Sequence, residues 1–296
     1  MNPKISVIIP TINYSNRKDA IDRILVSLDN QKTAVPFEVI IVNNEPGSTK
    51  REFDIVSAST QVIHEPEAGL SRARNAGVKV AIGNIIAFLD DDVIPAPTWL
   101  GAIVQTHKLQ TALCVGGPVT LIDSSFLRFP KWFSDYFLRF IIPPQFPKST
   151  EVITSPYYIV GANMSFKRDV FASYGFFDTN LGRVGACLLS GEDMEFMMRI
   201  PSEGIFYEPL AGVSTKMTSL RLTRGYFVRR IFWQAISEAR IFRKHGFDRY
   251  YDRSELFLSP YFGNKLLATL QHETIFQAIC MIIRIITFNI VSLLRL

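Results

Sequence analysis

Residues 85–92 read IIAFLDDD, five apolar residues followed by three carboxylates, Asp90, Asp91 and Asp92. The apolar run predicts a buried strand, and carboxylates at its end would lie at the carboxyl edge of a sheet, where open α/β sheets bind ligands. Three adjacent negative charges repel one another unless a cation lies among them. Oxygen ligands suit Mg²⁺ or Mn²⁺, and such an ion can hold a diphosphate. An acidic turn or a helix N-cap before Pro95 is the alternative interpretation of the same residues.

The composition is that of a globular protein with one unusually basic segment. Of the 296 residues 48% are hydrophobic and 20% charged, which allows a sizeable core and argues against gross disorder. The net charge is +5, but residues 216–253 alone hold ten Lys or Arg against three acids. This segment predicts an anionic partner, and its interleaved aromatics favour an amphipathic helix at a membrane surface over nucleic acid. Three widely spaced cysteines indicate reduced thiols in a cytosolic protein.

Strand and helix patterns alternate along the first part of the chain. Strands are predicted over residues 5–9, 37–42, 61–64, 85–89 and 113–115, and helices over 17–31, 71–82 and 98–109. This alternation predicts an α/β fold with a mostly parallel sheet covered on both faces. Residues 126–147 break the rhythm with aromatics, prolines and bases, which fit either an insertion over the core or a lid at a membrane surface. A strand over 157–166 and helices over 168–174 and 192–200 follow.

The C-terminal part predicts two helices, over residues 221–245 and 275–296. The second is almost wholly apolar and long enough to span a bilayer, which takes about 20 residues. Arg284 lies in its middle, where a charge costs ~2.5–3.5 kcal/mol on insertion scales. Gln277, Arg284 and Arg295 fall near one line of the helix, so an in-plane helix fits better than a membrane span. Packing against the domain or against a partner is the open alternative.

Five short motifs follow one another in a characteristic order. They read SVIIPTIN at 6–13, VIIVNN at 39–44, GLSRARNAG at 69–77, FLDDD at 88–92 and GED at 191–193. In this order and spacing the chain resembles the family 2 glycosyltransferases over roughly residues 4–215. The resemblance implies a GT-A fold, with a nucleotide-binding half over 1–120 and an acceptor half over 121–215. Residues 216–296 would form a basic and apolar helical extension at a membrane.

The resemblance also assigns residues to the nucleotide. Pro10, Thr11 and Asn13 would frame the base and the ribose. Asn44 stands where the family usually has an acid that pairs with the uracil edge. An amide can still accept a hydrogen bond from a ring N–H, so uridine or thymidine fits this position. The alternative for Asn43 and Asn44 is a turn.

The resemblance also assigns residues to the diphosphate and to the metal ion. Arg72 and Arg74 lie two residues apart near a helix start, so only one of them can reach the diphosphate, and the motif favours Arg74. A solvated basic face is the alternative. Asp92 would ligate Mn²⁺ or Mg²⁺, while Asp90 or Asp91 contacts the ribose or a metal-bound water. Asp90 and Asp92 thus form the D-x-D motif.

Two further segments would form the acceptor side of the site. Gly161, Ala162 and Asn163 resemble the strand that lines the donor sugar and the acceptor, although a plain core strand fits them too. Asp193 matches the base that takes a proton from the acceptor hydroxyl, and Glu192 would orient the acceptor or its helix. Stabilisation of the helix dipole is the alternative for this acidic pair.

The sequence departs from the family at one place. The histidine that often follows the acidic pair is absent from residues 211–216, where Lys216 could replace it as a cation for the diphosphate. The sequence after it lacks the Q-x-x-R-W motif of processive synthases, which predicts one sugar per encounter.

The leading hypothesis is therefore an inverting, metal-dependent glycosyltransferase at the cytoplasmic face of the cell membrane. Its donor would be a nucleotide-diphosphate sugar, by expectation a UDP-sugar. Its acceptor would be a saccharide or a lipid-linked glycan in surface polysaccharide biosynthesis. A catalytically silent subunit that binds a sugar nucleotide or a glycan is the alternative. A nucleotidyltransferase is a third reading, but the chain lacks the glycine-rich basic loop that such enzymes use.

Overall fold

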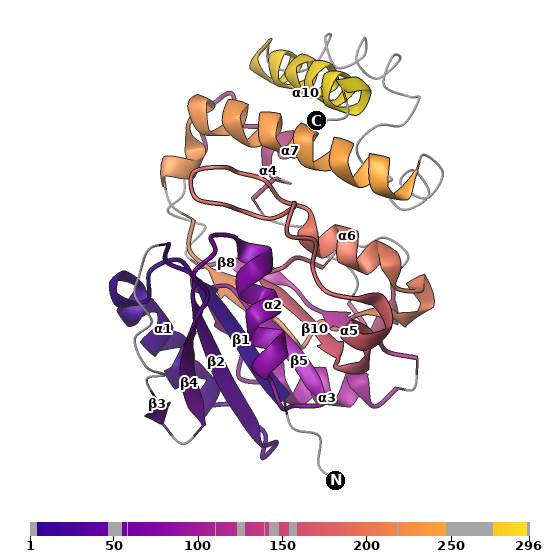
Figure 1. The fold of residues 1–296 in the computed structure, drawn as a ribbon. Helices are drawn as coiled ribbons and strands as arrows, with labels where there is room; N and C mark the ends of the chain where they lie inside the picture. Colours follow the sequence, from indigo (N-terminus) through magenta and orange to yellow (C-terminus); the bar gives the residue numbers. More distant parts are fainter. Residues whose placement is uncertain are drawn as a thin grey trace.

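The computed structural model describes residues 5–46, 55–57, 59–109, 111–122, 128–138, 140–141, 148–153, 159–217, 219–246 and 275–294. Its centre is a sheet with the strand order β3-β4-β2-β1-β5-β10-β7-β11-β9 (Figure 1). The strands are β1 (Ile5–Thr11), β2 (Phe37–Asn43), β3 (Ile55–Ser57), β4 (Thr60–His64), β5 (Ile85–Leu89), β7 (Cys114–Gly116), β9 (Glu151–Val152), β10 (Asn163–Lys167) and β11 (Ile205–Tyr207). Strands β4, β2, β1 and β5 are parallel, as the alternating pattern predicts, and β10 is antiparallel to β5.

Helices cover both faces of this sheet because successive strand residues point to opposite sides. Side chains at odd positions, such as Val7 and Ala87, pack with α1 (Tyr14–Asp29) and α3 (Trp99–His107). Side chains at even positions, such as Ile8 and Phe88, pack with α2 (Leu70–Val80), α5 (Asp169–Tyr174) and α6 (Glu192–Arg199). All five residues of β5 are buried, which confirms the strand predicted before the three aspartates.

A second, small sheet lies beside the carboxyl end of β5. It joins β6 (Val93–Pro95), β12 (Val213–Thr215) and β8 (Val119–Leu121) in the order β6-β12-β8. The strand β12 pairs antiparallel with β6 and parallel with β8. This pairing brings residues 213–215 next to the aspartate turn. Local patterns do not predict these strands because each has three residues.

Several predicted boundaries differ from the structure. β1 continues through Pro10 to Thr11, because its pairing with β5 ends at Ile8 and one side of the strand then needs no ladder donor. α2 begins at Leu70, with Gly69 in the left-handed φ range at 147°, and not at Ser71. β10 begins at Asn163 and not at residue 157, and residues 154–158 lie outside the described part of the chain.

The C-terminal helices form a separate layer, which lies at the end of the molecule opposite the N-terminus (Figure 1). α10 (Ile275–Leu294) packs along α7 (Arg224–His245), near the short α4 (Asp135–Leu138). Arg284 and Glu238 form an ion pair in this interface and are each 1% exposed. Gln277 accepts a hydrogen bond from Ser134. Gln277 and Arg284 therefore face the protein, which explains how the charge of Arg284 is accommodated in an apolar helix, whereas Arg295 lies outside the described residues.

The outer face of α10 is apolar. It exposes Ile279, Ile282, Ile286, Ile290 and Leu293, between 44% and 81% of each. Among the described helices, the stretch Phe276–Leu293 is long and apolar enough to cross a membrane, although 44% of it is buried in the protein. Of the aromatic insertion, residues 123–127, 139 and 142–147 lie outside the described part, as do residues 247–274 of the C-terminal region.

Candidate active site

A cleft of about 300 Å³ opens at the carboxyl end of β5. Asp90 and Asp92 line one part of it, and Glu192 and Asp193 at the start of α6 line another. Gly161 lies between them in the lining, just before β10. The cleft therefore brings together carboxylates from both halves of the chain, as the sequence predicted.

The three aspartates after β5 have different surroundings. Asp91 accepts a hydrogen bond of 2.6 Å from Thr11 Oγ1 and lies 3.5 Å from Arg17 Nε, so it is held by β1 and α1. Asp90 and Asp92 instead line the cleft, each with about a third of its side chain exposed. Burial raises the pKa of Asp92, and the negative charge of Asp90 raises it further. Asp90 and Asp92, two residues apart, thus lie on the cleft side of the turn, and Asp91 lies on the side of β1 and α1.

Arg74 does not point freely into the cleft. It is 1% exposed, its Nη1 lies 2.6 Å from Glu192 Oε1, and its Nη2 lies 3.1 Å from Asp90 Oδ1. Burial lowers the pKa of Arg74, but the nearby carboxylates of Glu192, Asp90 and Asp193 outweigh this and raise it. Both terminal nitrogens are thus bound to carboxylates, which gives Arg74 a structural role in the lining, and the expectation that it binds a diphosphate stays a prediction.

Arg72 and Asn75, on the same helix, also contact the protein. Arg72 Nη1 lies 2.6 Å from Oε2 of the exposed Glu67, so Arg72 forms a surface ion pair and does not point into the cleft. Asn75 donates to the carbonyl of Phe177 and accepts from its N–H. Asn75 therefore holds the loop after α5.

The residues predicted to bind the base have structural partners. The amide of Asn44 donates to the carbonyls of Glu65 and Glu67 and accepts from Gly69 N. It closes the loop between β4 and α2, so the turn interpretation of Asn44 is supported over base recognition. Asn13 caps α1 by accepting from Asn16 N and also donates to Glu45.

Of the residues before β10, Gly161 has the most direct link to the acidic pair. Its N–H donates to Asp193 Oδ2 at 2.7 Å. A Cβ at this position would overlap the guanidinium of Arg74, so any side chain here would have to displace Arg74. Ala162 lines the cleft, but Asn163 is 1% exposed and bonds to Trp99, Pro118 and Ala211. The structure therefore favours a scaffold role for Asn163 instead of the expected sugar contact.

Asp193 and Glu192 differ in how they are held. Both oxygens of Asp193 accept backbone hydrogen bonds, one from Gly161 and one of 2.8 Å from Met194 N. Glu192 is buried against Arg74, and burial followed by the charge of Asp193 raises its pKa. Gly191, at φ 84°, places the pair at the helix start. Asp193 thus faces the cleft in a fixed position, while Glu192 is tied into the wall.

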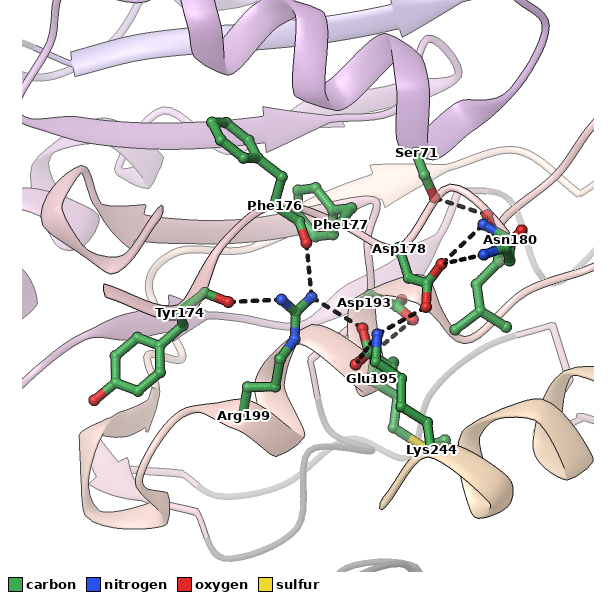
Figure 2. Close-up of polar contacts among 12 residues, drawn as sticks. Ser71, Tyr174, Phe176, Phe177, Asp178, Asn180, Asp193, Glu195, Arg199 and Lys244 are labelled. Carbon is green, nitrogen blue, oxygen red and sulfur yellow. Dashed lines mark hydrogen bonds and ion pairs between the residues drawn. The ribbon is translucent and has the colours of Figure 1, made fainter. Parts of the chain in front are cut away.

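A buried network under α6 fixes the direction of this helix (Figure 2). Glu195 is fully buried and accepts from Arg199 at 2.9 Å, from Lys244 at 3.1 Å and from His245 at 2.8 Å. Arg199 also donates to the carbonyls of Tyr174 and Phe176. Burial raises the pKa of Glu195, but the bonds from His245, Arg199 and Lys244 outweigh it and lower that pKa. The last turn of α7 and the end of α5 are thereby joined to the helix that carries Asp193.

Comparison with known proteins identifies the fold and the family. A family model described as "Glycosyl transferase family 2" matches residues 6–175, which is more than half of the chain. The chain belongs to this family. A solved structure of "Mannosyltransferase PcManGT from Pyrobaculum calidifontis in complex with GDP-Man and Mn2+" covers 99% of this chain and is covered for 88% of its own, with a TM-score of 0.59 and 17% identity. The fold of this glycosyltransferase is therefore GT-A, as predicted.

Two curated relatives are similar over most of the chain. The "Glucosyl-dolichyl phosphate glucuronosyltransferase" of Haloferax volcanii is 29% identical over 248 residues, which cover 79% of this chain and 76% of the relative. The "Chondroitin synthase" of Pasteurella multocida is 25% identical over 243 residues, covering 71% of this chain. The chain spans about a quarter of the length of that synthase. The enzyme class, transfer of a glycosyl group, is thus shared with these relatives.

The glycosyltransferase cleft also contains cations that the motifs did not indicate. Arg183, Arg221 and Arg230 line it, and Arg221 Nη2 lies 3.7 Å from Asp92 Oδ2. Lys216 is exposed and is not part of the lining, so the structure does not support the expectation that Lys216 serves the diphosphate. No short motif marks these arginines, which lie in a loop (Arg183), in the short 3-10 turn Ser219–Leu222 (Arg221) and in α7 (Arg230). The basic segment 216–253 was a signal for Arg221 and Arg230 but not for Arg183, and it did not indicate their position at the cleft.

Proposed function

We propose that this glycosyltransferase moves one sugar from a nucleotide-diphosphate sugar to a saccharide or lipid-linked glycan acceptor, with inversion, in surface polysaccharide biosynthesis. Residues 1–215 would form the catalytic domain and 216–296 its helical extension. One observation carries the proposal: Asp90 and Asp92 from one half and Asp193 from the other line a single cleft of about 300 Å³.

Asp193 is the proposed general base. Backbone N–H groups of Gly161 and Met194 hold both carboxylate oxygens, so the group is oriented before the acceptor arrives. The acceptor hydroxyl gives its proton to this carboxylate while its oxygen forms the bond to the anomeric carbon. The bond from that carbon to the diphosphate breaks at the same time, and the nucleoside diphosphate leaves. Arg74 and Glu192 position this wall without contacting the reacting atoms.

Asp92 and Asp90 are the proposed ligands of a divalent cation. Their fit to the ion rests on donor chemistry, since Mg²⁺ is usually held by one or two carboxylates together with substrate phosphates, and these two carboxylates line one cleft. Among the described residues there is no cluster of three or more acidic, His or Cys side chains that would hold a metal without the donor. Mn²⁺ or Mg²⁺ bound here would stabilise negative charge on the departing diphosphate.

The base assignment can be tested with Asp193→Asn and a matched control, Asp169→Asn, at an exposed first-turn position of α5. Release of nucleoside diphosphate is measured over a panel of nucleotide sugars with Mn²⁺, in which a UDP-sugar is the expected donor. Asp193→Asn should lower kcat by about 10²–10⁴-fold, the usual contribution of a general base, and leave donor affinity within about twofold. Turnover by Asp193→Asn close to the wild-type rate would contradict the role.

The cytoplasmic face of a membrane is the proposed location. The support is the basic α7 and the apolar outer face of α10, which together suit an anionic lipid surface. Sedimentation with anionic vesicles should be stronger than with neutral vesicles. Replacing Ile286 and Ile290 by Gln should reduce it, because both side chains are about half exposed and removal leaves the core intact. A wild-type chain that stays in the supernatant with anionic vesicles would remove the location from the proposal.

A further inference from the structure

The wall of the cleft formed by α7 contains a cation that the proposed mechanism does not use. Arg230 donates from Nη1 to Gln234 Oε1 at 2.7 Å and to Ser190 Oγ at 3.1 Å, and both acceptors are neutral. Its Nε is buried and has no hydrogen-bond partner. Within the described residues no carboxylate lies in ion-pair distance of Arg230, although the side chain lines the cleft.

Such an arrangement is costly unless a ligand compensates it. Arg230 is half-buried with its Nε enclosed, and two neutral acceptors compensate only part of the hydration that its charge loses. Two carboxylates that could compensate Arg230 already have partners, because Glu192 pairs with Arg74 and Glu238 pairs with Arg284. Burial, and then the positive charge of Arg183, lower the pKa of Arg230 to about 10.

Arg183 strengthens this local excess of positive charge. It lies in the loop before α6, lines the same cleft and forms no ion pair with any residue that the structure describes. Its backbone carbonyl accepts from Leu70 N, so the loop is anchored at the start of α2. Two guanidinium groups from separate elements therefore act on each other, and neither forms an ion pair with a carboxylate of the described residues.

Apolar side chains adjoin these arginines. Phe140, Ile141 and Tyr226 line the cleft on the side of the helical layer, and the guanidinium of Arg230 lies 5.8 Å from the ring centre of Phe140. The same layer carries the exposed isoleucines of α10 on its outer surface. An anion bound by the arginines would therefore have an apolar wall beside it. Such a wall would contact an apolar group attached to the anion, a group that inorganic phosphate and a sugar lack.

We propose that Arg183 and Arg230 bind a phosphate group of the acceptor, and that the adjoining apolar wall receives the start of a lipid chain attached to that phosphate. The acceptor would thus be a lipid phosphate or a glycan carried on one. This inference rests on the proposed function and names the acceptor class of the same cleft. The donor diphosphate would remain at the other end, near Asp92 and Arg221.

The test is a binding titration that does not depend on turnover. Geranylgeranyl phosphate, geranylgeraniol and inorganic phosphate are titrated separately into the full-length chain, and UDP with Mn²⁺ is titrated in parallel. Wild type should bind the prenyl phosphate at least about tenfold more tightly than the alcohol, which lacks the charge-assisted bonds, and than inorganic phosphate, which lacks the apolar chain.

Arg230→Gln and Arg183→Gln should each weaken binding of the prenyl phosphate by about 10- to 100-fold. Arg243→Gln is the matched control, because it removes the same charge from an exposed position of α7 outside the cleft. It should bind as wild type does, and all three variants should keep their affinity for UDP with Mn²⁺. Arg183 is exposed in a loop, so its variant tests the site even if Arg230→Gln fails to fold.

Three results would overturn the inference. The first is equal binding of prenyl phosphate by wild type and by a folded Arg183→Gln or Arg230→Gln. The second is equal binding of the prenyl phosphate and the alcohol, or of the prenyl phosphate and inorganic phosphate. The third is a loss confined to UDP with Mn²⁺, which would assign the arginines to the donor. Failure of the proposed function would show separately, as absence of nucleotide-sugar binding and turnover in wild type.

Discussion

Replacement of Arg74 by Met should destabilise the protein strongly, because this guanidinium connects the two halves of the cleft. Its partner Glu192 has 6% of its side chain exposed, so removing Arg74 leaves an unpaired charge in the interior. Breaking a buried pair in this way costs about 3–5 kcal/mol. Asp90 is 36% exposed and can be solvated, so its bond to Arg74 adds about 1 kcal/mol or less. The expected loss is therefore about 3–5 kcal/mol, dominated by Glu192.

Urea unfolding followed by tryptophan fluorescence would measure this loss. Arg72→Met is the matched control, since Arg72 pairs at the surface with Glu67 and should change stability by about 1 kcal/mol or less. The double variant Arg74→Met, Glu192→Gln should recover part of the loss, because it removes the unpaired charge. The loss should also shrink as the pH falls towards 5, since burial has raised the pKa of Glu192 and protonation neutralises it. A loss of less than about 1 kcal/mol, or a strictly additive double variant, would refute the reasoning.

Two further predictions concern other buried contacts. Burial lowers the pKa of His107 to about 3, so the unfolded chain takes up the proton first as the pH falls below 6.5. Between pH 6.5 and 5 the free energy of unfolding, measured with urea, should therefore fall by about 2 kcal/mol more in wild type than in His107→Gln. Parallel pH curves for the two proteins would contradict this. Gly161→Ala should lower both the thermal midpoint and the rate of nucleotide release, because its methyl group displaces Arg74 from Glu192 and Asp90. Gly101→Ala in α3, where the added Cβ makes an ordinary contact of 3.7 Å, should leave both unchanged or gain stability.

The elements that follow from local pattern were predicted well. The run 85–89 forms β5 with the predicted bounds, and the spacing of apolar residues placed α1, α6 and α7 within a few residues of their observed ends. The three-residue strands of the second sheet were missed, since so short a segment has no periodicity of its own. The cleft carboxylates Asp90, Asp92 and Asp193 were predicted to meet, because strand ends and helix starts gather at one edge of an α/β sheet.

The roles of individual polar side chains were predicted less well. Asn44 and Asn163 occupy motif positions, yet the structure shows them hydrogen-bonded to other segments of the protein, including Trp99 of α3 for Asn163. Arg74 has the expected positive charge, but its guanidinium forms ion pairs with Glu192 and Asp90 of the protein. A motif specifies residue type and place along the chain, whereas the partner of a side chain depends on which other segment folds against it.

The amino-acid sequence by itself determined the alternation of strands and helices, the acidic end of β5 and the family, because these depend on local periodicity and on motif order. The folded structure was needed to show that Arg74 is internal, that Arg230 is half-buried beside neutral partners and that Arg284 is neutralised by Glu238. The physical reason is that a charge is stabilised or left uncompensated by groups within a few ångströms. For Arg74 one of those groups, Glu192, lies 118 residues along the chain, and for Arg284 the group, Glu238, lies on a separate helix.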